Sequence, residues 1–336
     1  MKKRIGFGLL AISLVLTLFL AACGDGQAGA EDAPPRVAAL FPVPDPASGG
    51  GFDRANVAGL RVLEEEFGWH VSIAENVPYP QLDETAISFL TQGYDMIMYF
   101  DAGMMGSFET LPYDFPDQWF VMFSIVHEIP NLPNVAAFSP DFIEWGMITG
   151  MAMAEASETG IIGILGGAPI PALLEVFSGV IEGARFVDPE IEYIVHWTGD
   201  WNCPARHSEM TMLMVNAGAD VTFASTGAGA RGVYEAAEAS GTRTMGFAWD
   251  VYDDNPAAIL GSLMFNTPRS FAEFARAFES GTLGNEIVNL DSGYFEWADF
   301  RGSISPETES RILELTEQFK AGEIVIPLVL HPHIMQ

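Results

Sequence analysis

The fold is decided by residues 161–197, which read IIGILGGAPIPALLEVFSGVIEGARFVDPEIEYIVHW. The stretch opens with an apolar run that ends at Gly166 and Gly167, which predicts a short buried strand. Residues 173–184 then carry apolar side chains at helical spacing, and residues 192–197 predict a second strand. A strand, a helix and a strand in this order predict two parallel strands joined by a right-handed crossover.

The same alternation continues through the chain on both sides of this unit. Further strands are expected at residues 36–41, 70–74, 96–100, 119–123, 134–138, 221–225 and 244–249, and further helices at 56–67, 83–91, 144–157, 208–217 and 233–240. About 300 ordered residues exceed one sheet of ordinary size, so the pattern predicts an α/β fold with two lobes, each built on a parallel sheet. An eight-fold barrel shows the same alternation, but the long Pro- and Gly-rich loop after the first strand and the uneven helices favour two lobes.

The N-terminus carries the pattern of an export signal. Basic residues 2–4 precede the uncharged apolar run 5–20, and small residues follow, as in a secretory signal peptide over residues 1–22. The sequence Leu-Ala-Ala-Cys ending at Cys23 resembles a bacterial lipobox, so Cys23 is the expected site of lipidation. An uncleaved anchor is the alternative, because about 18 apolar residues can just span a bilayer. Residues 23–35 are small, acidic and proline-rich, and are expected to form a flexible tether.

The charge of the chain excludes nucleic acid as a partner. The formal net charge is −30, and removal of basic residues 2–4 leaves 12 Lys and Arg against 45 Asp and Glu, or −33. Such a surface repels phosphate backbones and disfavours polyanionic ligands. The acid excess can equally serve solubility alone, with no bearing on the ligand.

A glycine-rich motif, Gly227-Ala-Gly229-Ala-Arg-Gly232, follows a predicted strand and precedes a predicted helix. Asp250 lies eighteen residues beyond its last glycine, so the spacing matches a dinucleotide-binding fingerprint. Its position argues against that function, because the fingerprint normally follows the first strand of its domain. We expect no cofactor here, and a turn whose backbone N–H groups can face ligand oxygens.

The sequence contains no persuasive catalytic or metal-binding constellation. It lacks G-x-S-x-G, H-E-x-x-H and a Walker loop, and its two cysteines and six histidines show no zinc spacing. Cys203 and His207 could form a thiol nucleophile, but Pro204 between them favours a loop that leads into a helix. We therefore expect neither an enzyme nor a metal site.

Polar and aromatic residues stand where the predicted strands end, which is the edge at which open parallel sheets bind ligands. They are Phe52 and Asp53 in the loop after the first strand, Asp101, Trp201 with Asn202, and Trp249 with Asp250. A flat ligand stacked between aromatic faces, with carboxylates on its hydroxyl groups, would suit this set. Packing between the lobes is the alternative role for each aromatic residue.

These segments occur in an order that resembles the basic membrane lipoprotein family, the purine nucleoside receptor type of ABC-transporter substrate-binding protein. The resemblance covers residues 36 to about 327. It rests on Gly51-Phe52-Asp53 with Gly59; Asn134-Val135 with Phe138, Gly146 and Gly150; residues 160–167 with Pro171, Phe177, Gly179 and Gly183; Trp201-Asn202-Cys203-Pro204-Ala205; residues 218–221 with Gly227, Gly232 and 235–237; and Gly246 with Asp250.

The resemblance implies the type I periplasmic-binding fold and a role for several residues. The N-terminal lobe would comprise residues 36–145 plus about 250–282, and the C-terminal lobe residues 146–249 plus about 283–336. Phe52 and Trp201 would sandwich a base, Gly227 would present backbone groups, and Asp250 would accept hydrogen bonds from ribose hydroxyls.

Three departures from the family pattern bear on the ligand. Asp53 replaces the usual Asn, and Ala248 stands where an aspartate is often found. The lysine usual shortly after the serine that matches Ser262 is missing. The loss of that cation and of one carboxylate makes a free nucleobase or another small aromatic solute a candidate beside a purine nucleoside.

As a member of such a family, the chain would act as a two-lobed clamp without chemistry of its own. It would be a monomer on the extracytoplasmic face of the cell membrane, held there by its lipid alone. Its partners would be a small neutral ligand and an ABC permease. A ligand-sensing receptor subunit of the same fold and an extracytoplasmic enzyme are the alternatives from other classes.

Overall fold

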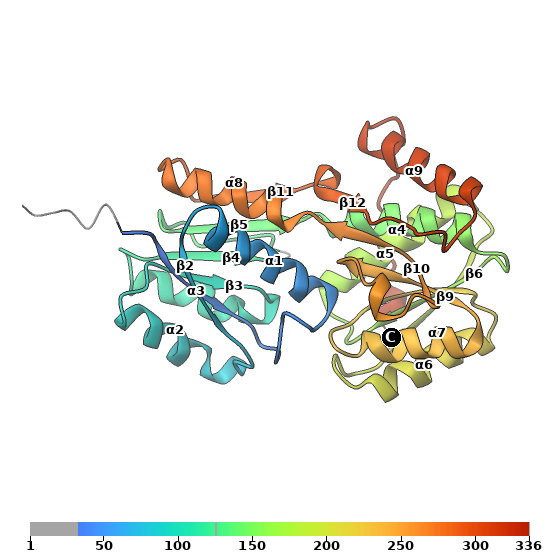
Figure 1. Cartoon of the computed structure of the whole chain (residues 1–336), viewed down its shortest axis with the longest axis horizontal. Helices are drawn as coiled ribbons and strands as arrows, with labels where there is room; N and C mark the ends of the chain where they lie inside the picture. The colour runs from blue at the N-terminus through green and yellow to red at the C-terminus, as the bar shows by residue number, and fades with distance from the viewer. Residues whose placement is uncertain (1–32, 125, 336) are drawn as a thin grey trace, which may run out of the picture. The chain divides into compact units, whose positions relative to one another are not determined.

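A computed structural model describes residues 33–124 and 126–335 of the chain. The expected signal peptide, Cys23 and most of the expected tether lie outside these residues. The remainder, from Pro34 on, contains two six-stranded sheets, which confirms the two-lobed α/β prediction and excludes the barrel. Figure 1 shows the two sheets side by side, each with helices packed on its faces.

The first sheet is wholly parallel and has the strand order β11-β5-β4-β3-β1-β2. Its strands are β1 (Arg36–Leu40), β2 (His70–Ala74), β3 (Met96–Tyr99), β4 (Trp119–Phe123), β5 (Val135–Pro140) and β11 (Ile287–Leu290). The helices of this lobe are α1 (Gly51–Glu65), α2 (Leu82–Thr91), α3 (Met105–Thr110) and α8 (Thr267–Glu279). β3, β4 and β5 are apolar almost throughout because helices cover both faces of the sheet.

The second sheet repeats this topology in the order β12-β10-β9-β8-β6-β7, with only β12 antiparallel. Its strands are β6 (Ile161–Gly166), β7 (Glu192–Trp197), β8 (Val221–Ser225), β9 (Arg243–Ala248), β10 (Ile259–Phe265) and β12 (Phe295–Trp297). Its helices are α4 (Phe142–Ala156), α5 (Pro171–Val187), α6 (Pro204–Asn216), α7 (Ala230–Ser240) and α9 (Pro306–Lys320). In both sheets the strand order reverses beside the first strand, which creates the crevice where such sheets bind ligands.

The expected lobe boundaries differ from the observed ones at two strands. β10 falls in the range expected for the N-terminal lobe, but it pairs with β9 in the second sheet. β11 falls in the range expected for the C-terminal lobe, but it pairs with β5 in the first sheet. The chain thus returns to each lobe once after residue 250, and only long-range strand pairing decides where it does so.

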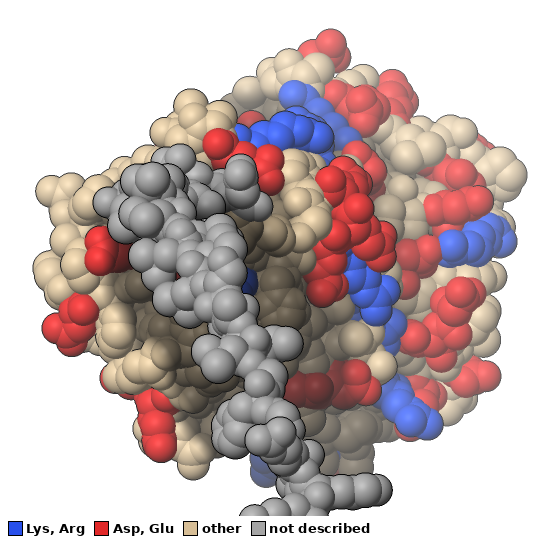
Figure 2. All heavy atoms as spheres, turned by 60° about the vertical axis from the view of Figure 1, so that its left-hand side comes forward, with Lys and Arg blue, Asp and Glu red and all other residues tan. Residues whose placement is uncertain are grey.

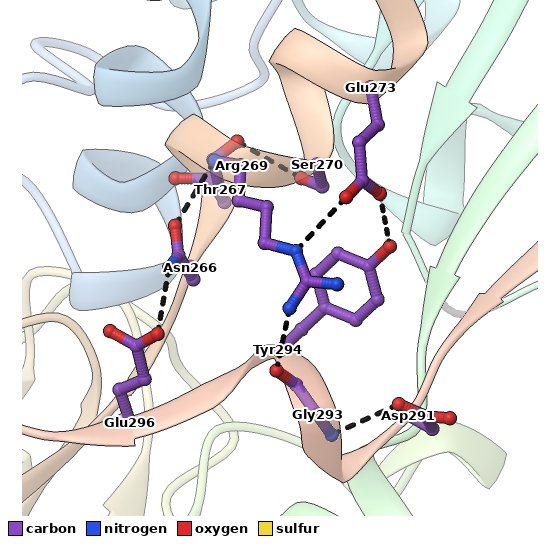
Figure 3. A network of polar contacts seen from close by, with 9 residues as sticks. All are labelled: Asn266, Thr267, Arg269, Ser270, Glu273, Asp291, Gly293, Tyr294 and Glu296. Atoms are coloured by element: carbon purple, nitrogen blue, oxygen red, sulfur yellow. Dashed lines mark hydrogen bonds and ion pairs between the residues drawn. The ribbon is translucent and has the colours of Figure 1, made fainter.

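The chain crosses between the sheets after β5, after β10 and after β11, and hydrogen bonds join these crossings. The Asp141 N–H donates to Leu290 O (2.9 Å), and the Asn266 N–H donates to Tyr294 O (2.8 Å). Figure 3 shows the polar network there: Arg269 Nε donates to Glu273 Oε1 (3.0 Å), and the Tyr294 hydroxyl donates to the other oxygen of Glu273. The Arg269 guanidinium also lies 4.4 Å from the centre of the Tyr294 ring. These contacts tie together the three segments that cross between the sheets.

Helices α4 and α5 pack through four glycines. Gly146 and Gly150 on α4 face Gly179 and Gly183 on α5, and a Cβ atom at any of them would lie 2.0–2.5 Å from a backbone oxygen of the other helix. The backbones approach this closely because the glycines have no side chains. The family-like glycines at these positions therefore serve helix packing.

The surface carries the acidic excess that the composition indicates. Figure 2 shows carboxylates spread over one face of the molecule with a few basic side chains between them. Within the described part of the chain, no helix is both long enough and apolar enough to cross a membrane.

Candidate functional site

A cavity of about 350 Å³ lies between the two lobes at the carboxyl ends of their strands. Its walls come from the segments after β1, β3 and β4 of the first sheet, and from those after β6, β7 and β8 of the second. Of the predicted binding residues, six line this cavity: Phe52, Asp53, Asp101, Trp201, Asn202 and Gly227. Because parallel strands end at one edge, residues far apart in sequence meet there.

The aromatic walls come from both lobes. Phe52 and Asp53 lie in the first turn of α1 and not in a loop, because the helix begins at Gly51, earlier than its apolar spacing indicates. The Phe52 ring packs edge-on against Phe142 (5.9 Å between centroids), and Phe142 contacts Phe247 (5.4 Å). Phe142 and Phe247 also line the cavity, and no sequence pattern marks them, because Phe142 begins α4 and Phe247 lies within β9.

Trp201 forms the opposite wall and its loop is held by hydrogen bonds. The Asp200 carboxylate accepts from the N–H groups of Asn202 (2.7 Å) and Cys203 (2.9 Å). These two bonds, acting against partial desolvation, keep the pKa of Asp200 below its ordinary value. The indole rests on Gly167, where a Cβ atom would lie 2.4 Å from the ring, and 36% of Trp201 remains exposed. The Trp201 indole is therefore held in place by its loop and by Gly167, and part of it remains free to contact a ligand.

Two carboxylates are the only charged groups among the described residues that line the cavity. Burial, and after it the nearby charge of Asp101, raises the pKa of Asp53 to about 7. Asp101 accepts hydrogen bonds from the Tyr79 hydroxyl (2.8 Å) and the Gly103 N–H (2.7 Å). Asp53 is thus part protonated near neutral pH, and the site can offer a ligand both a hydrogen-bond donor and acceptors.

We expect the stability of the protein to fall between pH 4 and pH 7 through Asp53. Its folded pKa of about 7 lies above the ordinary value of 3.8, so the native state holds the proton more tightly than the unfolded state does. This contribution is complete below about pH 4 and is lost as the pH rises towards 7. Asp53→Asn should remove it, so the variant should gain on the wild type by up to a few kcal/mol at pH 8 (~1.4 kcal/mol per pKa unit), and by less than half of that at pH 5.

Thermal unfolding of both proteins at pH 5 and pH 8 measures this difference. Asp114→Asn is the matched control, because it removes an exposed carboxylate outside the cavity. Parallel pH profiles for Asp53→Asn and the wild type would contradict the assignment.

Asp250 does not line the cavity. Ala248 has a positive φ of 59°, and the Trp249 N–H donates back to Phe247 O (2.8 Å), so the chain turns away after β9. Phe247 reaches the cavity instead, and Asp250 pairs with Arg301 at 2.6 Å. Partial burial alone would raise the pKa of Asp250, but the hydrogen bonds from Arg301 hold it below its ordinary value. The structure therefore places Asp250 outside the cavity lining, and its role at the ligand stays a prediction.

The glycine-rich motif packs helices and does not offer a row of free N–H groups. A Cβ atom at Gly232 would lie 1.9 Å from Pro204 O, and one at Gly229 would lie 2.3 Å from the His207 ring. The Ala228 N–H donates to Asn202 Oδ1 (3.3 Å), and the Gly229 N–H donates to Trp201 O (3.1 Å). Asn202 and this turn therefore brace the Trp201 loop, and only Gly227 of the motif reaches the cavity.

The pair of Cys203 and His207 has no geometry for catalysis. The His207 ring is buried, with Nδ1 on the backbone oxygen of Cys203 (2.8 Å) and Nε2 on Thr198 Oγ1 (3.3 Å). Both ring nitrogens are occupied, so His207 is not aimed at the thiol. No group of three His, Cys, Asp or Glu residues suited to a metal lies within residues 33–124 and 126–335.

Two serines and one threonine that no sequence motif marks also line the cavity: Ser124, Ser225 and Thr226. Ser225 ends β8, Thr226 follows it, and Ser124 follows β4, the same edge as the predicted residues. The strand-end rule could have found them, but a serine or threonine in a loop carries little signal by itself.

Comparisons with known proteins agree with this architecture. Residues 36–327 match the family described as ABC transporter substrate-binding protein PnrA-like. The transcriptional activator protein med of Bacillus subtilis is 24% identical over 93% of this chain and 97% of its own. A purine-binding protein of Brucella abortus is 24% identical over 62% of this chain and 59% of its own.

A solved structure shows the same fold. The ABC transporter solute-binding protein of Aeropyrum pernix superposes with a TM-score of 0.76 at 18% identity, over 90% of this chain and 95% of that one. The fold is thus the type I periplasmic-binding fold, with two parallel sheets joined by three crossings. The chain belongs to the PnrA-like family of ABC transporter substrate-binding proteins.

Proposed function

We propose that this protein is an extracytoplasmic, lipid-anchored receptor that binds a purine nucleoside or a related base for an ABC importer. The observation that carries the proposal is the cavity between the lobes, whose aromatic walls come from both lobes and whose charged groups are two carboxylates. A flat, neutral ligand with hydrogen-bond donors on its edges fits such a site. The family and the purine-binding relative support the same ligand class.

The expected mechanism is closure of the two lobes on the ligand. Phe52 lies on the first lobe and Trp201 on the second, so a base between them contacts both lobes only when they close. The three crossings near Asp141, Asn266 and Tyr294 would bend, and the permease would recognise the closed form. Our proposal assigns no bond-making step to the chain.

The carboxylates define the ligand class further. Asp250 is paired with Arg301, so ribose hydroxyls or base N–H groups would meet Asp53 and Asp101 instead. No Lys, Arg or His is found among the described residues that line the cavity. A phosphate would therefore meet the charge of Asp101, and that of Asp53 when it is ionised, without a counter-ion, at about 4 kcal/mol per pair for charges 4 Å apart near a protein surface.

We expect adenosine or guanosine to bind most tightly, adenine somewhat less tightly, and AMP at least about a hundredfold more weakly than adenosine. Titration calorimetry of the domain from residue 34 on measures all four. The double variant Asp53→Asn, Asp101→Asn is the matched variant, because it removes the repulsion. It should reduce the difference in affinity between adenosine and AMP. Tight AMP binding by the wild type would contradict the electrostatic argument, and no binding of the four would contradict the proposed ligand class.

A ligand-sensing receptor is the second candidate, because the relative med is a transcriptional activator that matches over nearly its full length. Uptake of the ligand by proteoliposomes that contain the partner permease distinguishes an importer component from a sensor. Ligand-dependent transport supports the importer, and ligand binding without any transport supports the sensor.

The anchor is tested at Cys23, which lies outside the described residues. Cys23→Ala should release the protein from membranes or block its maturation, because the thiol would carry the lipid. Membrane fractionation and gel mobility report the result, and Cys203→Ala serves as the control that leaves the lipobox intact. A Cys23→Ala variant that stays in the membrane with unchanged mobility would show that the apolar run 5–20 spans the bilayer.

A further inference from the structure

One buried hydroxyl at the cavity has no hydrogen-bond partner. Among the described residues, three buried side-chain oxygens lack a partner: Asn56 Oδ1, Thr149 Oγ1 and Thr226 Oγ1. Only Thr226 lines the cavity. Thr226 is 8% exposed and its Oγ1 is buried, so neither bulk water nor the protein satisfies the hydroxyl in this arrangement of the lobes.

Thr226 lies at a point where the two lobes come close to each other. It follows β8, the strand beside which the order of the second sheet reverses. On the other lobe, a Cβ atom at Gly50 would lie 3.2 Å from Thr226 O and 3.1 Å from Gly227 Cα. Asp53 lies less than one helical turn beyond Gly50 and lines the same cavity. A ligand at this end of the cavity therefore meets groups from both lobes.

The free-energy cost of leaving the Thr226 hydroxyl without a partner makes this position selective between ligands. A buried hydroxyl without a partner costs about 1–3 kcal/mol, whereas one that bonds to a ligand atom contributes favourably. In a more open arrangement of the lobes, water can bond to the same hydroxyl. Closure thus favours ligands that present a hydrogen-bonding atom to Thr226, and disfavours ligands that present a C–H group there.

We propose that Thr226 is a specificity-determining residue of this receptor, and that its hydroxyl hydrogen-bonds to a polar atom of the bound ligand as the lobes close. The inference rests on the proposed function, because adenosine serves as the probe. It adds a contact from the second lobe that is independent of the aromatic sandwich and of the carboxylates. Thr226 selects by the hydrogen-bonding edge of the ligand, whereas Phe52 and Trp201 select by its flat face.

The test compares Thr226→Val with Thr226→Ser by titration calorimetry with adenosine. Valine keeps the shape of the side chain and removes the hydroxyl, so the affinity should fall about tenfold. Serine keeps the hydroxyl, so the affinity should stay within about threefold of the wild type. Thr149→Val is the matched control: it removes a buried, unpartnered hydroxyl outside the cavity and should leave the affinity unchanged.

Thermal unfolding without ligand separates binding from folding. Thr226→Val should not lower the melting temperature, because no hydrogen bond within the described chain is lost. Equal affinities of Thr226→Val and the wild type for adenosine would overturn the Thr226 inference and leave the proposed function intact. A wild-type protein that binds none of adenosine, guanosine and adenine would overturn both.

Ligand analogues then locate the atom that Thr226 meets. The probes are adenosine and three analogues that each lack one of its polar groups. The 2′-hydroxyl is missing from 2′-deoxyadenosine, the 3′-hydroxyl from 3′-deoxyadenosine, and the exocyclic amine from purine riboside. The analogue without the contacted group should bind the wild type and Thr226→Val equally, while the others keep the tenfold difference. The same loss for every analogue and for free adenine would place the contact on a ring nitrogen of the base, which all of these ligands keep.

Discussion

Trp201→Ala is expected to weaken purine binding by about 1–3 kcal/mol, which is the contribution of one base–aromatic stack. Trp201 is 36% exposed at the cavity, and hydrogen bonds from Asn202 and Cys203 to Asp200 fix its loop without help from the indole. The loss should therefore fall on the affinity and leave the melting temperature nearly unchanged. Titration calorimetry and thermal unfolding of the same preparation measure the two effects separately.

Phe52→Ala should weaken binding by a similar amount and also lower the stability, because Phe52 packs on Phe142 as well as lining the cavity. Trp249→Ala is the matched control for both. Trp249 lies on the other side of the turn at Ala248, and it does not line the cavity. An affinity that is unchanged in Trp201→Ala and Phe52→Ala would remove the aromatic sandwich from the proposed site.

Gly150→Val is expected to destabilise the fold by about 3 kcal/mol or more, the upper range for overpacking a core. A Cβ atom at Gly150 would lie 2.0 Å from Val180 O, which is backbone and cannot rotate aside. The two helices would have to separate, and with them the glycines at 146, 179 and 183. Since a typical domain is stable by only about 5–15 kcal/mol, we expect a large fall in melting temperature or poor accumulation of the folded protein.

Gly106→Ala is the matched control for this prediction. Gly106 lies in α3, and nothing is within 4 Å of a Cβ atom placed there. Alanine is the better helix former by up to about 1 kcal/mol, so this variant should be as stable as the wild type or more stable. A Gly150→Val protein that unfolds at the same temperature as Gly106→Ala would contradict the close packing of α4 and α5.

The sequence by itself determined the alternation of strands and helices up to residue 249. Apolar runs such as those at β3 and β8 are buried on both faces, and glycines end several of them, so local pattern and final structure agree. The same reasoning brought Phe52, Asp101 and Trp201 to one cavity, because parallel strands end at a shared edge. Beyond residue 249 no elements were predicted, although the structure has β10, α8, β11, β12 and α9 there.

Tertiary structure alone decided the details on which the ligand depends. A left-handed turn at Ala248 takes Asp250 out of the cavity and gives it to Arg301, and nothing in the local sequence marks that turn. β10 joins the second sheet and β11 joins the first, contrary to the predicted lobe boundaries. Pairing with β9 and with β5, respectively, decides this. Thr226 became a candidate only because its hydroxyl lacks a partner in the packed structure. Whether a polar atom is satisfied depends on every neighbour in space, and a linear pattern does not contain that information.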